Sequence, residues 1–190
     1  GNGNIWVSIG NKGVYVLNTE SFTIADKFEP RNKDEHGLMS NRISSLFKDS
    51  EGNMWLGDPG DNDLGLYKYL EEQNRFKNYQ FSANDSLTLI SNEIYSIYED
   101  DMSRMWVGTD GGLNLFQNET NNFRHIELTE DENELFKSNQ IRELHQSSDG
   151  VLWIGSGAGL SSIDKTLQQI RNYPQKKVRA IWEDDHKQLW

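Results

Sequence analysis

The stretch Asn92–Phe116, NEIYSIYEDDMSRMWVGTDGGLNLF, decides the fold of this chain. Apolar residues at Ile94 and Ile97 predict a first β-strand, which an acidic turn follows. Met105–Gly108 predicts a second strand, and two glycines then break the chain before an apolar run at 113–116. The same pattern recurs along the whole sequence. A repeat at a fixed period determines the architecture before any other feature is considered.

Tryptophan marks the same position in each unit: Trp6, Trp55, Trp106, Trp153 and Trp190, at spacings of 49, 51, 47 and 37 residues. Twelve positions earlier, each unit that is complete at its front has an aliphatic residue: Ile43, Ile94, Ile141 and Val178. A second apolar residue follows that one by three positions: Leu46, Ile97, Leu144 and Ile181. A period of roughly 47 residues with short strands and glycine-bearing turns is typical of propeller blades, whose periods are about 40–50 residues.

The second strands are apolar without alternation, as in Met105–Val107 and Leu152–Ile154. A strand buried on both faces reads this way, whereas a half-solvated strand alternates apolar and polar residues. The sequence therefore predicts an all-β protein, a β-propeller of four-stranded blades that stack on one another. The repeated tryptophans are expected in the core between blades, and Trp182 is expected to pack from a first strand.

About four blade-equivalents fit into the 190 residues, so the chain is interpreted as part of a larger propeller. The expected divisions are a partial blade at 1–29, blades at 43–79, 94–126 and 141–173, and the start of a further blade at 178–190. Two other arrangements remain open. The last strand could pair with the first unit and close a four-blade ring, or two copies could complete each other as a homodimer.

Composition excludes several classes of function. A net charge of −11 and a pI near 4.8 argue against a nucleic-acid surface, which needs clustered Lys and Arg. No apolar run approaches the length of about 18 residues that spans a bilayer, so no membrane contact by this region is expected. The sequence has no cysteine, which excludes disulfides and thiolate metal sites. No cofactor is expected.

Two units carry a family resemblance. One is Ile94–Asp100 with Trp106–Leu113, and the other is Ile141–Leu144 with Gly150–Gly155 and Gly159-Leu160. They resemble the two-component regulator propeller repeat over almost the whole chain. Ser147, in place of an acidic residue, and Ser8, in place of glycine, are local departures. The resemblance implies the periplasmic sensor region of a Bacteroidetes hybrid histidine kinase that senses an oligosaccharide. It also implies that further blades, a membrane span and a kinase lie elsewhere in the full-length protein.

In a propeller with the inner strand first, the loops entering strand one and those joining strands two and three share one face, where ligands commonly bind. The entering positions are Asn41, Arg42, Asn92, Glu93, Asn139, Gln140 and Lys177. The loop positions are Asn11, Lys12, Asp58, Asn62, Asp110 and Ser156. These side chains could hydrogen-bond sugar hydroxyls. The alternative is that the repeated asparagines only satisfy turn backbone, which asparagine does well.

The remaining motifs do not indicate catalysis or a metal site. Asp58–Asp63 offers oxygen ligands suited to calcium but lacks EF-hand spacing, so an ordinary acidic turn is favoured. Ser147–Trp153 resembles the Asp-box of sialidases but is one residue short. The acidic turns recur in every unit, whereas a catalytic carboxylate pair should be unique. We expect a non-catalytic binding module. A propeller glycoside hydrolase or lyase and a protein-interaction scaffold are the alternatives.

Overall fold

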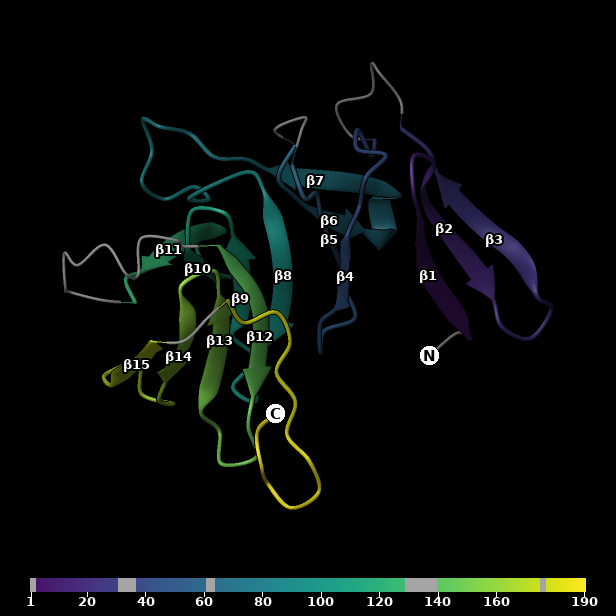
Figure 1. Ribbon diagram of the computed structural model, residues 1–190. Coiled ribbons are helices and arrows are strands. Elements are labelled where there is room, and N and C mark those ends of the chain that lie inside the picture. The colour runs from purple at the N-terminus through teal and green to yellow at the C-terminus, as the bar shows by residue number, and fades with distance from the viewer. Residues whose placement is uncertain (1–2, 31–36, 61–63, 129–139, 175–176) are drawn as a thin grey trace.

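The computed structural model describes residues 3–30, 37–60, 64–128, 140–174 and 177–190. Within them lie four antiparallel sheets (Figure 1). The first sheet has three strands: β1 (Asn4–Ile9), β2 (Gly13–Asn18) and β3 (Thr23–Phe28). The second has four strands: β4 (Ser45–Lys48), β5 (Met54–Gly57), β6 (Leu66–Leu70) and β7 (Arg75–Tyr79). A short 3-10 helix, η1 (Glu71–Gln73), joins its last two strands.

The third and fourth sheets repeat the four-stranded plan. The third contains β8 (Ile94–Glu99), β9 (Met105–Thr109), β10 (Leu113–Gln117) and β11 (Asn122–Ile126). The fourth contains β12 (Ile141–Gln146), β13 (Leu152–Ser156), β14 (Gly159–Ile163) and β15 (Ile170–Pro174). Strands pair in chain order within each sheet, and β4, β8 and β12 lie at the inner side of the arc of sheets (Figure 1). The predicted all-β propeller architecture is confirmed.

The core lies between neighbouring sheets. Trp55 of β5 is 1% exposed and meets Phe116 of β10 edge-on, with ring centroids 5.0 Å apart. Trp106 is fully buried and clusters with Ile141 and Ile154 of the fourth sheet. Trp6 lies 5.1 Å from the ring of Tyr69 in the second sheet. Burial of each aromatic side chain against the next sheet therefore holds the array together.

In each four-stranded sheet, a hydrogen bond joins the tryptophan indole to the side chain six positions earlier and so fixes the length of the turn between them. The indole N–H of Trp106 donates to Asp100 at 2.8 Å, and that of Trp55 donates to Asp49 at 2.8 Å. The same Asp100 carboxylate accepts the N–H of Arg104 in the turn at 3.0 Å. In the fourth sheet Ser147 replaces the acid, and its hydroxyl accepts from Trp153 at 3.0 Å. The repeated acidic turns therefore have a structural role.

The segment after the fourth sheet differs from the expectation. Val178–Asp184 was predicted as a strand, but it carries one isolated bridge, between Glu183 and Leu189. Trp182 and Trp190 exchange both backbone hydrogen bonds, at 3.1 and 2.8 Å. The segment folds as a loose hairpin because, among the described residues, it has only its own end as a β partner.

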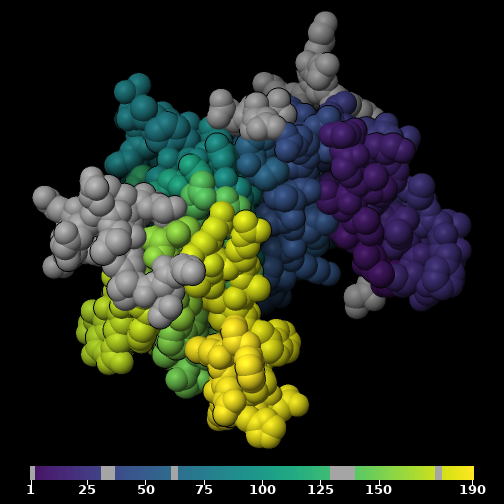
Figure 2. Space-filling view, viewed as in Figure 1, coloured from purple at the N-terminus to yellow at the C-terminus, as the bar shows by residue number. Residues whose placement is uncertain are grey.

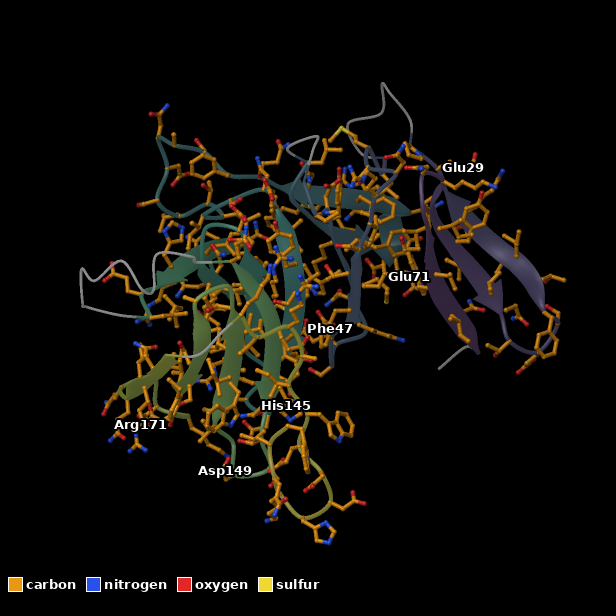
Figure 3. The ribbon with its side chains drawn as sticks, in the orientation of Figure 1. Glu29, Phe47, Glu71, His145, Asp149 and Arg171 are labelled. Carbon is orange, nitrogen blue, oxygen red and sulfur yellow. The ribbon has the colours of Figure 1, made fainter. Side chains whose placement is uncertain are left out.

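This hairpin leaves two tryptophans outside the core, contrary to expectation. The centroid of the Trp182 ring lies 6.3 Å from that of His145 on β12, as that of Phe47 on β4 lies 6.4 Å from that of Tyr98. Figure 3 labels His145 and Phe47 on their strands. Trp182 is nevertheless 67% exposed and Trp190 75% exposed, because no complete sheet among the described residues covers them. Figure 2 shows the hairpin, in yellow, against the fourth sheet.

The four-blade ring closed through the last segment is not the arrangement of this structure. Among the described residues, β1 pairs with β2 alone.

In the same part of the chain, no helix has the length and apolar character needed to cross a bilayer.

Candidate functional site

The candidate site lies where the inner strands begin. There the entering residues meet the loops that join second and third strands, as backbone hydrogen bonds show. The N–H of Ile94 donates to Asp58 O at 2.7 Å, and the N–H of Asp110 donates to Glu93 O at 3.0 Å. In the fourth sheet the N–H of Gly157 donates to Gln140 O at 3.2 Å. Predicted site residues from neighbouring sheets are thereby brought to one end of the array.

Five side chains at this end form one connected network, the Tyr95 cluster: Glu93, Tyr95, Asp110, Gln140 and Arg142. The Tyr95 hydroxyl lies 2.8 Å from Glu93 Oε2 and 3.3 Å from Asp110 Oδ1. Gln140 donates from Nε2 to Asp110 at 2.6 Å and accepts from Arg142 Nη2 at 2.8 Å. The Arg142 guanidinium lies 4.3 Å from the Tyr95 ring centre. The cluster spans two sheets and joins an aromatic ring to both charge signs.

The electrostatics of the cluster favour a neutral, hydrogen-bonding tyrosine. Burial, the hydrogen bond to Glu93 and the nearby carboxylates raise the pKa of Tyr95 to about 12. Its hydroxyl therefore remains a donor at neutral pH. Gln140 orients Arg142 while Tyr95 supports the face of the guanidinium, an arrangement that fixes the direction of its N–H groups.

A β-bulge explains how Tyr95 and Arg142 reach the cluster. The register of β8 against β9 shifts between Ile94 and Ser96, and that of β12 against β13 shifts between Ile141 and Glu143. One extra residue therefore lies at each bulge, Tyr95 in β8 and Arg142 in β12. Bulges re-aim side chains in this way beside functional sites. Sequence reasoning missed both residues, although their position directly after the first buried isoleucine was the available signal.

Lys177 is exposed and precedes Val178, whose N–H donates to Ser156 O at 3.0 Å. The pKa of Lys177 is lowered, first by the charge of Arg142, then by burial and by the charge of Arg179. Ser156, also predicted for the site, is buried and turns its hydroxyl inward to its own loop, where it accepts the N–H of Ala158 at 3.1 Å. Ser156 therefore contributes backbone, not its side chain, to this end of the sheets.

The other predicted residues lie outside the cluster. Asp58 is fully buried and accepts the N–H of Gly60 at 2.8 Å, while its Oδ2 has no partner among the described residues. Burial and the Asp58 charge raise the pKa of Tyr67. Asn92 accepts the N–H of Phe81 at 2.6 Å and so braces the linker after the second sheet.

The remaining predicted positions are peripheral. Asn11 and Lys12 form the exposed β1–β2 turn, in which Asn11 has a φ of 60°, a conformation that asparagine tolerates. Asn41 is half-buried, and exposed Arg42 donates its backbone N–H to Ser40 Oγ at 3.0 Å. Asn62 and Asn139 lie outside the described residues.

The calcium hypothesis falls mostly on residues outside the described part of the chain. Within that part, no group of three or more His, Asp or Glu side chains is arranged to hold a metal ion.

Comparison with known proteins adds a family to this geometry. The model of the family described as "two component regulator propeller" matches residues 37–60 and 88–111. Two segments of the chain therefore match the two-component regulator propeller repeat, one in the second sheet and one in the third. The resemblance seen in the sequence is confirmed, and the second repeat contains Glu93, Tyr95 and Asp110 of the cluster. No curated protein matches the chain.

Solved propellers share the fold of these repeats at low sequence identity. An extracellular domain from B. thetaiotaomicron, named for the hybrid two component system BT4673, matches 97% of this chain and 24% of its own at 19% identity, with a TM-score of 0.71. One named for the system BT3049 of the same organism matches 100% of this chain and 30% of its own at 17% identity, with a TM-score of 0.54. The chain thus spans less than a third of the length of these extracellular domains.

An enzyme has the same fold. Virginiamycin B lyase from Staphylococcus aureus matches 100% of this chain and 59% of its own at 15% identity, with a TM-score of 0.69. At such identities the likeness concerns the fold alone, and function depends on the site.

Proposed function

We propose that this chain is part of the ligand-binding propeller of a two-component signalling protein, and that it binds an oligosaccharide at the Tyr95 cluster. The matched repeats support the signalling context, and the extracellular domains that share the fold support a location in the periplasm. The chain spans 24–30% of those domains. We propose that further blades, a membrane span and a kinase lie in other parts of the full-length protein.

The observation that carries the proposal is the network linking Tyr95 to Asp110 and, through Gln140, to Arg142. A sugar hydroxyl is both donor and acceptor, and carboxylate, amide and guanidinium groups together satisfy both roles. The groups come from strand starts and one tight loop on two packed sheets. Such a scaffold holds them in place before a ligand arrives, which reduces the entropy cost of binding.

A second candidate function rests on the same carboxylates. Glu93 and Asp110 approach one hydroxyl at 2.8 and 3.3 Å, and glycoside hydrolysis uses a pair of carboxylates across the scissile bond. Here both carboxylates face the Tyr95 hydroxyl, which orients them as hydrogen-bond acceptors. The binding role is therefore favoured, and product analysis separates the two functions.

The test is calorimetric titration of the purified protein with a panel of oligosaccharides, followed by chromatography of each mixture. Binding without new products is expected. Asp110→Asn and Glu93→Gln should each weaken binding about tenfold or more, because a hydrogen bond to a charged group contributes about 1.5–3 kcal/mol. The matched control is Asp185→Asn, at an exposed turn position.

Each other outcome points to a different function. Accumulating cleavage products would establish the enzyme. No binding to any oligosaccharide, together with a well-folded protein, would favour the interaction scaffold.

A further inference from the structure

The residues that flank the start of each inner segment have a charge balance opposite to that of the whole chain. The chain contains 30 acidic and 19 basic residues. Two residues flank the first apolar residue of each inner segment. At these positions in the four units stand four basic residues (Arg42, Arg142, Lys177 and Arg179) and one acidic residue, Glu93. A solvated surface drawn at random from this composition would show the reverse balance.

Three of these cations are placed beside one another by the backbone around Ser156. Ile141 pairs with Ser156 across β12 and β13, and the N–H of Val178 donates to Ser156 O at 3.0 Å. Arg142 follows the first of these neighbours, while Lys177 and Arg179 flank the second. The lowered pKa of Lys177, caused first by Arg142, reflects this proximity.

The three cations make no direct ion pair within the described part of the chain, and Gln140 stands between Arg142 and the Asp110 carboxylate. None of Arg142, Lys177 and Arg179 forms an ion pair there, and Arg142 Nε is buried without a hydrogen-bond partner. Like charges held together repel one another, and within the described residues no carboxylate of this acidic chain forms an ion pair with them. An anion from outside would remove this repulsion.

We propose that the oligosaccharide bound here is acidic, with a carboxylate or sulfate group held by Arg142, Lys177 and Arg179. This inference rests on the proposed function and names its ligand class. Arg142 Nη2 is engaged by Gln140, and Tyr95 supports the guanidinium plane, so the fork is oriented before the anion binds. Glu93 and Asp110 accept hydrogen bonds from hydroxyls of the neighbouring sugar ring, because these two carboxylates would repel the anionic group itself.

The experiment compares acidic oligosaccharides with their own neutral counterparts by calorimetry on the intact protein. The probes are oligogalacturonides against their carboxyl-reduced forms, and heparin-derived oligosaccharides against their desulfated and carboxyl-reduced forms. At least one acidic probe is expected to bind tenfold or more tightly than its counterpart, with affinity that falls as salt rises. Arg142→Met and Lys177→Met should each remove most of this preference.

Two controls separate charge from folding. Arg124→Met removes an exposed arginine from β11 and should leave both affinities unchanged. Lys177 is exposed, so its variant should keep the melting temperature of the wild type even if Arg142→Met does not.

The failures are distinguishable. Equal affinity for acidic and neutral members would overturn the anion site and leave the proposed oligosaccharide sensor standing. Inorganic sulfate binding as tightly as any acidic saccharide would overturn the saccharide as the source of the anion. Binding of no saccharide at all would overturn both proposals.

Discussion

At the scale of single residues, the turns are held by carboxylates that have several donors each. Asp100 accepts from Trp106, Arg104 and the turn backbone, and Asp164 accepts from the N–H groups of Gln168 and Gln169 at 2.9 and 2.7 Å. Such carboxylates fix the hairpins that present the strands to one another. The pKa of Asp164 is lowered by these donors, so its charge stabilises the fold and acid should weaken that contribution.

Asp164→Asn tests this expectation. The Thr166 hydroxyl and backbone N–H groups hold the pKa of Asp164 at about 2, below the value of about 3.9 in an unfolded chain. The charged form therefore stabilises the fold above about pH 4, and this contribution is lost as pH falls to about 2. We expect a lower melting temperature than wild type at pH 7 and a difference that shrinks as pH falls through about 2. A difference as large at pH 2 as at pH 7, or one that Asp185→Asn reproduces, would contradict this.

At the scale of elements, the turn after each inner strand is clamped to the next inner strand. Ser50 donates its N–H and hydroxyl to Glu99 at 2.6 and 2.7 Å. In the next clamp the carboxylate lies on the turn and the amide on the strand. Asp101 donates its N–H to Gln146 Oε1 at 2.7 Å, and Gln146 Nε2 donates to the Asp101 carboxylate at 2.8 Å. A carboxylate occurs on only one side of each clamp, which avoids like-charge repulsion.

Gln146→Glu should therefore lower the free energy of unfolding, since it replaces the amide that donates to Asp101 by a second carboxylate. Asp101→Ser in the same chain should restore stability because it recreates the serine–glutamate pair of the preceding clamp. Urea unfolding of the two single variants and the double variant measures the coupling. Additive losses in the double variant would show that the clamps act independently of charge.

The elements could be predicted from sequence further than the site could. Strands and turns follow from periodic apolar residues, and the meeting of entering residues with loops follows from the propeller plan. The role of Tyr95 and Arg142 could not be predicted from the sequence. Side chains in a strand ordinarily alternate with a period of two, and the spacing of three between Ile94 and Ile97 was not recognised as a bulge. The exposure of Trp182 was also missed, since burial depends on which sheet covers it.

At the scale of the whole molecule, the sheets form a nearly one-dimensional array. The substantial contacts between strands of different sheets join consecutive sheets, such as β1 with β4, β4 with β8, and β8 with β12. In such an array, stability is a sum of terms for each unit and for each interface between neighbours. Damage at one interface should therefore remain local.

Tryptophan truncations measured by hydrogen exchange test this locality. Trp6→Ala removes the contact with Tyr69 and should speed exchange in the first sheet while leaving β13 unchanged. Trp106→Ala empties a fully buried site at the third interface, at a cost of about 3–5 kcal/mol, and should speed exchange in the third and fourth sheets together. Equal acceleration in all four sheets would show a single cooperative unit. In that case a ligand bound at the Tyr95 cluster would slow hydrogen exchange in the first sheet as well. In a one-dimensional array it would slow exchange only in the sheets beside the cluster.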